Sequence, residues 1–329
     1  MTSEQLSSPP SLSVVIPVYN NQATLPKLVA QLDGLHGRLE IPMEAIFVID
    51  GSPDQSQEVL RDVLPHAEVS SRLLIHARNF GAFAAIRTGL SAARGAYVSV
   101  LAADLQEPPE LVADFYQVLA SGRADVVVGA RQSRVADPLG VRLTSAVFWW
   151  LYRRIVNREI PEGGADVFAC TRDVRDVLVN LDERNSSLIG LLFWVGFRRA
   201  VVVYDREVRA DDSPSGWTLR RRLRYMADST FSFSDLPIKV LMWVGGVASL
   251  LLVAVAMVVL VSHIFGLISV QGYTPLMLLS ATGFTVTLFA IGVVGSYTWR
   301  AFENTKRRPS SIVMTDEDFA GHPARENYD

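Results

Sequence analysis

The feature that most restricts the fold of this chain is a long apolar segment near its C-terminus. From Val240 to Trp299 the sequence contains no Asp, Glu, Lys or Arg. A membrane-spanning helix needs about 20 apolar residues, so the segment is long enough for two. Glycines and a proline interrupt its middle, and we therefore predict two transmembrane helices, at about 238–265 and 275–299. A buried helical hairpin of a soluble protein is the alternative.

Basic residues lie on both sides of this segment. Arginines cluster at 220–224 before it, and Arg300, Lys306, Arg307 and Arg308 follow it, whereas the loop between the two predicted helices has no basic residue. Loops rich in Lys and Arg remain in the cytoplasm. We therefore expect an integral, multi-pass membrane protein whose large N-terminal region and C-terminal tail are both cytoplasmic.

Composition excludes several functions. The net charge is −3, which is too close to neutral to indicate a nucleic-acid partner. The only cysteine is Cys170, so the chain can form neither an internal disulfide nor a cysteine metal cluster.

The N-terminal two thirds of the chain alternates between strand and helix patterns. Short β-rich apolar runs occur at 12–19, 45–50, 72–77, 96–103 and 125–130, and helical periodicity lies between them. Strands that alternate with helices predict an α/β domain with a parallel sheet and helices on both faces. Two further apolar segments, 145–156 and 188–197, are too short to span a membrane. Each fits a helix lying in the membrane interface or an ordinary core helix.

Ligands of such sheets bind beyond the carboxyl ends of the strands. In this chain those ends carry polar residues, namely Tyr19, Asn20, Asp50, Asn79, Asp104, Gln106 and Arg131. No Gly-x-Gly-x-x-Gly follows the first strand and no Gly-x-x-x-x-Gly-Lys-Ser/Thr is present, which argues against a dinucleotide cofactor and against an ATPase of that class.

Two aspartates at these strand ends suit the recognition of a nucleotide diphosphate. Asp50 can bind the base and ribose, or it can simply form the turn before Gly-Ser-Pro. Asp104, with Gln106 two residues later, can hold a divalent metal through oxygen atoms, or it can cap the following helix.

The ordered set of motifs resembles a known family. VVIPVYNN, FVIDGSPD, RNFGAFAAIRTGL, ADLQEPPELV and VVVGAR are similar to family 2 glycosyltransferases, and more narrowly to polyprenyl-phosphate (dolichol- or undecaprenyl-phosphate) glycosyltransferases. The similarity continues through GADVFACTRDV and PSGWTLRRRLRYMADSTFSFSDLP into the two terminal helices. Each motif is weak by itself, but their order and spacing over nearly the whole chain are specific.

This resemblance implies a GT-A (Rossmann-like) catalytic domain that moves a sugar, with inversion, from a nucleotide-sugar donor to polyprenyl phosphate at the cytoplasmic membrane face, for cell-envelope glycan assembly. It implies Mg2+ or Mn2+ as the cofactor, held by Asp104 and Gln106. Asp104 and Asp166 are the expected catalytic residues, although Asp166 can also cap a helix. The expected nucleotide-sugar site contains Pro17, Tyr19, Asn20, Asp50, Asn79, Gln106 and Arg131, and the lipid phosphate is expected at Arg206, Arg209 and Ser215.

The sequence departs from the family pattern at four places. Ala102 stands where the family has the first aspartate of Asp-x-Asp, which weakens the expected metal site. The other departures are Ile49, Val167-Phe168 and Ser213. Two alternative functions remain: a processive polysaccharide synthase, which would carry a Gln-x-x-Arg-Trp motif that this chain lacks, and a catalytically weak scaffold or pseudoenzyme of the same fold.

The expected organisation has five parts. A disordered N-terminus (1–11) precedes the cytoplasmic glycosyltransferase domain (12–210), a juxtamembrane amphipathic helix (211–237), two transmembrane helices (238–299) and a cytoplasmic tail (300–329). The sequence leaves a homo-oligomer open, and it names neither the sugar nor the nucleotide.

Overall fold

The computed structural model describes residues 10–131, 167–181, 188–205, 236–265, 273–306 and 308–322. The chain divides into two compact units. The first comprises residues Met1–Asp182, Ser187–Thr218 and Arg308–Asp329, and the second comprises Glu183–Ser186 and Leu219–Arg307. The predicted boundary after residue 210 therefore lies close to a unit boundary, but the C-terminal residues belong to the first unit.

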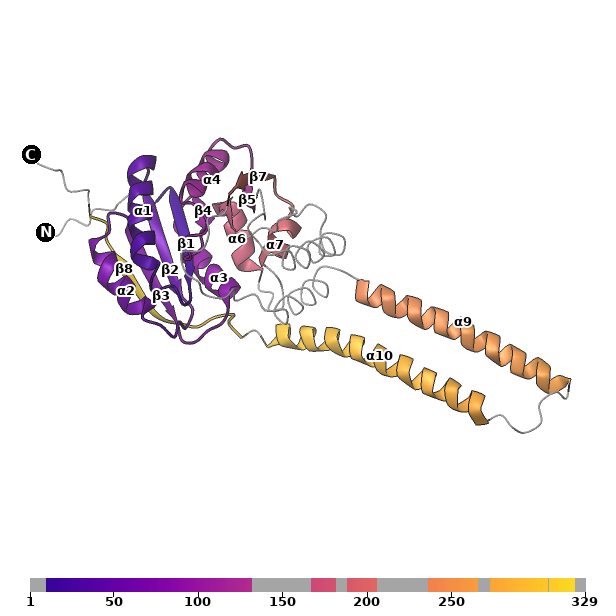
Figure 1. The fold of residues 1–329 in the computed structure, drawn as a ribbon. Helices are drawn as coiled ribbons and strands as arrows, with labels where there is room; N and C mark the ends of the chain where they lie inside the picture. The colour runs from indigo at the N-terminus through magenta and orange to yellow at the C-terminus, as the bar shows by residue number, and fades with distance from the viewer. Residues whose placement is uncertain are drawn as a thin grey trace, which may run out of the picture. The chain divides into compact units, whose positions relative to one another are not determined.

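The first unit is built on one eight-stranded sheet (Figure 1). The strands are β1 (Leu12–Val18), β2 (Met43–Ile49), β3 (Ser70–His76), β4 (Tyr97–Val100), β5 (Val126–Arg131), β6 (Phe168–Thr171), β7 (Arg199–Tyr204) and β8 (Val313–Phe319). Their order in the sheet is β7-β5-β6-β4-β1-β2-β3-β8. All seven residues of β2 are buried, as expected of a central strand covered on both faces.

The sheet is mixed, which corrects the prediction of a parallel sheet. β1, β2, β3 and β4 are parallel, but β6 pairs antiparallel with β4 and β5, and β8 pairs antiparallel with β3. β7 is parallel to β5. The five predicted strands are present within three residues of their expected bounds. The sequence pattern did not predict β6, β7 or β8; β6 has only four residues, and β8 carries three acidic residues.

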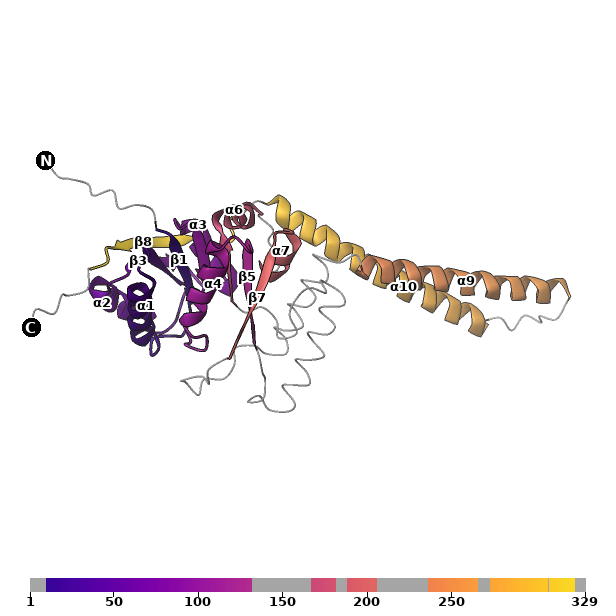
Figure 2. The ribbon, with the colours of Figure 1, turned by 90° about the horizontal axis from the view of Figure 1, so that it is seen from above.

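Helices cover both faces of the sheet. They are α1 (Leu25–Leu39), α2 (Ser56–Val63), α3 (Ala82–Ala92), α4 (Glu110–Ala120), α6 (Arg172–Asn180) and α7 (Leu188–Trp194), with a short 3-10 turn, η1 (Leu64–His66), after α2. Seen from above, α1, α2 and α4 lie on one side of the sheet and α3 and α6 on the other (Figure 2).

The two faces of β1 explain this arrangement. Val14 and Ile16 belong to the core cluster that contains the apolar stripe of α1. Val15 points to the opposite face, where a Cβ added at Gly89 of α3 would lie 2.2 Å from its side chain. Glycine at position 89 therefore allows α3 to pack closely on the strand.

Helix α7 is a core helix. Residues Leu188 to Phe193 of α7 are buried, and Trp194 is the exposed residue at its end. The segment 188–197 therefore contains a core helix. The other apolar segment, 145–156, lies outside the described residues, as do most of the predicted juxtamembrane helix and residues 1–9 of the N-terminus.

The second unit contains the helices α9 (Leu236–Ile264) and α10 (Tyr273–Thr305), which have 29 and 33 residues and lie side by side (Figures 1 and 2). Their bounds agree with the two helices expected in the apolar segment, and α10 continues six residues beyond the predicted end. In the described part of the chain, no helix meets the combined length and hydropathy criterion for crossing a membrane.

Candidate active site

The candidate site begins where the loops after β1 and β2 meet. Asn20, just beyond β1, adopts a left-handed backbone with φ of 56°. Its N–H donates to Ser52 Oγ at 2.8 Å, and Ser52 Oγ donates to Asp54 Oδ1 at 2.5 Å. Asp54 Oδ2 also accepts from the N–H of Gln22, at 3.0 Å. The two loops are therefore joined by hydrogen bonds that converge on one carboxylate.

The charge of Asp54 is stabilised in this position. Burial by itself raises the pKa of this carboxyl, but hydrogen bonds from Ser52, Ser56 and the Gln22 N–H outweigh it, so that the pKa falls below its usual value. Tyr19 and Asn20, two predicted nucleotide-binding residues, are exposed next to this junction, and Pro17 is half-buried in β1.

The turn after β2 also touches the loop after β3. Gly51 has φ of +59°, and a Cβ at this position would lie 2.4 Å from the backbone nitrogen of Asn79 and 2.5 Å from the carbonyl carbon of Arg78. Only glycine fits both the backbone conformation and the space. The structure therefore brings two of the predicted nucleotide-sugar-binding residues, Asp50 and Asn79, to adjacent loops.

Asp50 is buried, and both of its carboxylate oxygens bind other groups of the protein. Its Oδ1 lies 2.8 Å from His76 Nδ1 and accepts from the Phe80 N–H at 2.8 Å, while Oδ2 accepts from the Gly81 N–H at 2.7 Å. Burial raises the pKa of Asp50, but the hydrogen bonds from His76, Phe80 and Gly81 more than offset this effect and lower the pKa.

This geometry gives Asp50 a clear structural task. Its carboxylate holds the backbone at the start of α3, where N–H groups would otherwise lack partners. Beside it, the guanidinium of Arg78 lies 4.1 Å from the centre of the Phe80 ring, and Asn79 is exposed. Asn79 is thus accessible to a ligand, whereas Asp50 organises the loop that presents it.

Asp104 and Gln106 follow β4 in a second tight loop. Asp104 is half-buried, and its Oδ1 accepts from the Gln106 N–H at 3.3 Å. Leu105 between them has φ of 58°, and the Thr24 hydroxyl at the start of α1 donates to the carbonyl of Ala103 at 2.6 Å. The loop after β4 is therefore fastened to the loop after β1.

Asp104 and Gln106 fit a divalent cation that takes most of its ligands from a substrate diphosphate and water. Among the described residues there is no group of three or more His, Cys, Asp or Glu side chains suited to a metal ion. Asp104 offers carboxylate oxygens, and Ala102 offers none. Mg2+ commonly uses one or two protein carboxylates together with substrate phosphates and waters, so one carboxylate is sufficient when a diphosphate supplies the rest.

Arg131 ends β5 and pairs in register with Tyr204 of β7. Because β6 lies between β5 and β4, Arg131 is separated from Asp104 by one strand of the sheet. The carboxyl ends of β1, β2, β3 and β4 lie along one edge, and the strand order reverses between β1 and β4, which is where ligands of such sheets bind. The predicted residues Asp166, Arg206, Arg209 and Ser215 lie outside the described residues.

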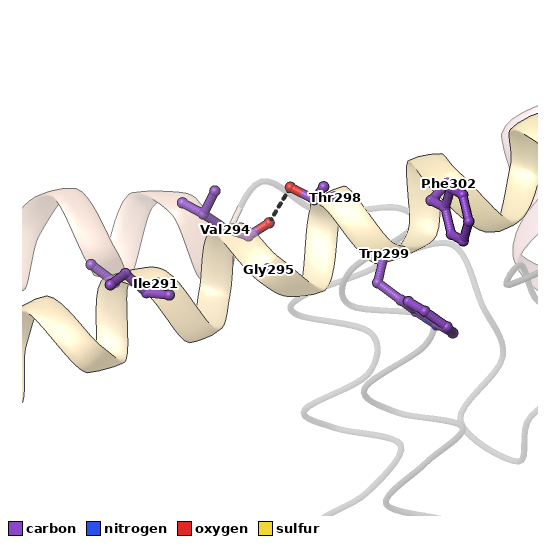
Figure 3. Close-up of a pocket in the computed structure, with 7 residues that line it drawn as sticks. Ile291, Val294, Gly295, Thr298, Trp299 and Phe302 are labelled. Carbon is purple, nitrogen blue, oxygen red and sulfur yellow. Dashed lines mark hydrogen bonds between the residues drawn. The ribbon is translucent and has the colours of Figure 1, made fainter.

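An apolar hollow lies in the second unit. It has a volume of about 600 Å³ and is lined by α10 residues alone: Ala290, Ile291, Val294, Gly295, Thr298, Trp299 and Phe302 (Figure 3). The Thr298 hydroxyl is occupied by a 2.9 Å hydrogen bond to the Val294 carbonyl. None of the predicted donor-site residues lines it, and its chemistry does not suit a nucleotide.

Sequence reasoning missed several residues of the site. Thr24, Ser52, Asp54 and His76 make contacts that shape it, and none was predicted. Asp54 had a detectable signal, because it lies in the turn sequence Gly51-Ser52-Pro53-Asp54. His76 had none, since a histidine at the end of an apolar strand indicates no particular role.

Comparisons with known proteins agree with this geometry. Residues 13–172 match the model of glycosyl transferase family 2. The chain is 33% identical to an uncharacterized glycosyltransferase of Synechocystis, over 92% of this chain and 94% of that protein. It is 30% identical to a prophage bactoprenol glucosyl transferase homolog of Escherichia coli, over 92% and 98% of the two chains, and 30% identical to the bactoprenol glucosyl transferase of Shigella phage SfV, over 93% and 99%.

A solved structure is more distantly similar. Glucosyl-3-phosphoglycerate synthase from Mycobacterium tuberculosis matches with a TM-score of 0.48 and 17% identity, over 68% of this chain and 80% of that one. This similarity is too distant for its ligands to be transferred to this chain. The relatives of about 30% identity decide the assignment, together with the family match over residues 13–172: this chain is a glycosyltransferase and belongs to glycosyl transferase family 2, with an α/β catalytic domain.

Proposed function

We propose that this chain transfers a sugar from a nucleotide-sugar donor to polyprenyl phosphate at the cytoplasmic face of a membrane, and that the product serves cell-envelope glycan assembly. The observation that carries this proposal is the extent of the similarity to the bactoprenol glucosyl transferases. It spans 97% to 99% of their length, so it includes the apolar C-terminal region as well as the catalytic domain. A shared catalytic domain alone would leave the acceptor open.

The donor would bind along the edge formed by the ends of β1 to β4. Tyr19, Asn20 and Asn79 are exposed there and can contact a base, a ribose or a sugar. Asp50 would support this surface from beneath, through the amides of Phe80 and Gly81. The loops are joined by side-chain hydrogen bonds, which lowers the entropy lost when the donor binds.

The reaction would proceed with inversion. An oxygen of the acceptor phosphate attacks the anomeric carbon as the bond from that carbon to the nucleotide diphosphate breaks, and the electron pair leaves with the diphosphate. A phosphate monoester is already anionic near neutral pH, so no strong general base is needed. Asp166 would orient the acceptor, and Arg206, Arg209 and Ser215 would bind its phosphate.

Negative charge on the departing diphosphate requires stabilisation, which is often the largest contribution to catalysis. Arg131 can supply part of it. A divalent cation, Mg2+ or Mn2+, would supply charge neutralisation at the diphosphate when bound. Asp104 would be its carboxylate ligand, and the Gln106 N–H fixes the orientation of that carboxylate.

A polyprenyl-phosphate acceptor would lie in a membrane, and the apolar segment is suited to that location. We propose that α9 and α10 enter the membrane as a hairpin. Support comes from the absence of Asp, Glu, Lys and Arg between Val240 and Trp299, and from large apolar side chains exposed on both helices, such as Trp243, Leu250, Phe284 and Ile291. The basic residues on both flanks favour a cytoplasmic location for the catalytic unit.

The test is a direct assay of the lipid product. Purified full-length protein is incubated with undecaprenyl phosphate, Mg2+ and each member of a panel of nucleotide sugars, and the lipid fraction is analysed by mass spectrometry. We expect one sugar to be added to the lipid phosphate, with free nucleoside diphosphate released in equal amount. Sugar transfer to water or to a growing glycan, with no lipid-linked product, would contradict the proposal.

A further inference from the structure

The structure contains a chain of hydrogen bonds that runs from the candidate donor site to the C-terminal segment. His76, at the end of β3, is buried. Its Nδ1 lies 2.8 Å from Asp50 Oδ1, and its Nε2 lies 2.9 Å from Thr88 Oγ1 on α3. Thr88 Oγ1 in turn lies 2.7 Å from Ser311 Oγ, which precedes β8. The C-terminal segment is therefore connected to Asp50 through Thr88 and His76.

The geometry of these hydrogen bonds indicates which groups donate and which accept. The lowered pKa of Asp50 keeps the carboxylate ionised, so it can only accept, and His76 Nδ1 must carry a proton. With the ring proton on Nδ1 alone, Nε2 is an acceptor and the Thr88 hydroxyl donates to it. The oxygen of Thr88 is left to accept from the Ser311 hydroxyl. Each group thus fixes the orientation of the next one.

The C-terminal segment is also held in place by contacts other than these hydrogen bonds. The Ala77 N–H donates to the Ile312 carbonyl at 3.0 Å, and β8 continues the antiparallel pairing along β3. Charged side chains add to the pairing: Arg72 binds Asp316 at 2.6 Å, and Arg61 binds Glu317 at 2.6 Å. Ser311 is therefore presented to Thr88 by an ordered strand.

We propose that Ser311, Thr88 and His76 are positioning residues of the donor site, and that the segment following the apolar helices completes that site. Through His76 they hold Asp50, and Asp50 holds the amides of Phe80 and Gly81 at the start of α3. The expected effect on donor affinity rests on the proposed function. The contacts themselves do not depend on that function.

The physical argument concerns what is lost when one link is removed. A buried polar group that loses its partner costs more than a solvated one, because no water replaces the bond. Without the Thr88 hydroxyl, His76 keeps one hydrogen bond and gains freedom to rotate about its side chain. The Asp50 carboxylate then loses a fixed donor, and the amides that it holds become less ordered.

The experiment uses the full-length protein and four variants. Thr88→Val removes the central hydroxyl at nearly constant volume, Thr88→Ser restores it, and Ser311→Ala removes the outer link. Ser91→Ala is the matched control, because Ser91 is an exposed residue of the same helix whose hydroxyl donates to the Arg87 carbonyl within α3. Hydrogen exchange of the amides of residues 77–82 is measured without substrate, and KM and kcat are measured with UDP-glucose and undecaprenyl phosphate.

We expect Thr88→Val to raise exchange in residues 77–82 and to raise the donor KM about fivefold, as for the loss of one hydrogen bond, with less change in kcat. Ser311→Ala should have a smaller effect of the same kind, and Thr88→Ser and Ser91→Ala should resemble the wild type. Unchanged exchange in both Thr88→Val and Ser311→Ala overturns the inference. If the exchange effect appears but wild-type protein transfers no sugar from any donor, the proposed function fails while the positioning contacts stand.

Discussion

Position 102 is where this chain differs most from the family pattern at the level of single residues. Alanine occupies it, so Asp104 is the remaining carboxylate at the end of β4. The neighbouring Gln106 N–H orients that carboxylate, and the Thr24 hydroxyl fastens the loop at Ala103. A single oriented carboxylate can hold a cation that a diphosphate also ligates, but it binds the free cation weakly.

We therefore expect activity that requires Mg2+ or Mn2+ in the millimolar range and falls by about 100-fold or more in Asp104→Asn, because charge on the leaving diphosphate is no longer neutralised. Ala102→Asp should lower the metal concentration needed for half-maximal rate. The measurement is initial rate against free metal concentration. Asp114→Asn, at an exposed position of α4, is the control and should behave as wild type. Full activity in excess chelator, or an active Asp104→Asn enzyme, would show that Arg131 and other arginines are sufficient.

The buried Asp50 leads to a prediction on pH. Its pKa in the folded protein lies below the ordinary value of 3.8, so its ionised form stabilises the fold fully above that value, and the stabilisation is lost as the pH falls through the folded pKa. Asp50→Asn should therefore lower the free energy of unfolding by about 2 kcal/mol between about pH 5 and 8. The difference from wild type should narrow below pH 3.8. Thermal melting of both proteins across this range is the measurement, and a difference that stays constant down to pH 3 contradicts the assignment.

At the scale of elements, the loops between strands and helices are packed backbone against backbone. At Gly51, the turn after β2 meets the backbone of the loop after β3 with no space for a Cβ. Such contacts tolerate no added atoms, in contrast to the exposed faces of the helices.

Two glycine-to-alanine substitutions compare a tightly packed loop with a helix position that has free space. Gly51→Ala places a Cβ 2.4 Å from the Asn79 nitrogen in a left-handed conformation, and it should destabilise the protein by more than about 3 kcal/mol and abolish donor binding. Gly34→Ala, within α1, meets no atom within 4 Å and should stabilise the protein by about 0.5–1 kcal/mol. Thermal melting tests both, and a Gly51→Ala protein as stable as wild type would rule out the close approach.

Strand β8 is the element that changes the expected organisation most. It covers the edge of β3, which would otherwise expose unpaired backbone groups. Its acidic side chains pair with arginines of the sheet and of α2, although such exposed pairs each contribute at most about 1 kcal/mol. The ladder hydrogen bonds are therefore its main attachment.

Removing residues 311–329 should lower the free energy of unfolding by about 2 to 4 kcal/mol, from several ladder bonds of about 1 kcal/mol each, and should increase aggregation through the bare β3 edge. Removing only residues 323–329, which leaves β8 intact, is the control. Melting temperature and light scattering report the two effects. Equal behaviour of the two truncated proteins would mean that β8 does not hold the sheet edge.

At the scale of the whole molecule, the chain combines a catalytic unit with two long apolar helices, and it returns to the catalytic unit for its last strand. This order requires the segments before α9 and after α10 to be on the same side of any membrane that the helices enter. From the basic residues on both flanks we predict that this side is the cytoplasm.

Cysteine labelling in intact cells tests this topology. A membrane-impermeant maleimide should label Gln271→Cys from outside, and it should label Ser310→Cys only after the cells are permeabilised. The native Cys170 gives little background, because it is buried and burial raises the pKa of its thiol to about 12. Protection of Gln271→Cys in intact cells, together with labelling of Ser310→Cys, would invert the predicted orientation.

The sequence by itself determined the features that depend on local pattern. Alternating apolar runs located β1 to β5, turn residues located the strand ends with Asp50, Asn79 and Asp104, and the lack of charge located α9 and α10, because these signals arise from neighbouring residues. Only the tertiary structure decided that β6 and β8 run antiparallel, that Asp50 faces His76 and the start of α3, and that Ser311 meets Thr88. The contact between Ser311 and Thr88 alone joins residues 223 positions apart, and pairing at such separation is set by the packing of the whole sheet rather than by any local preference.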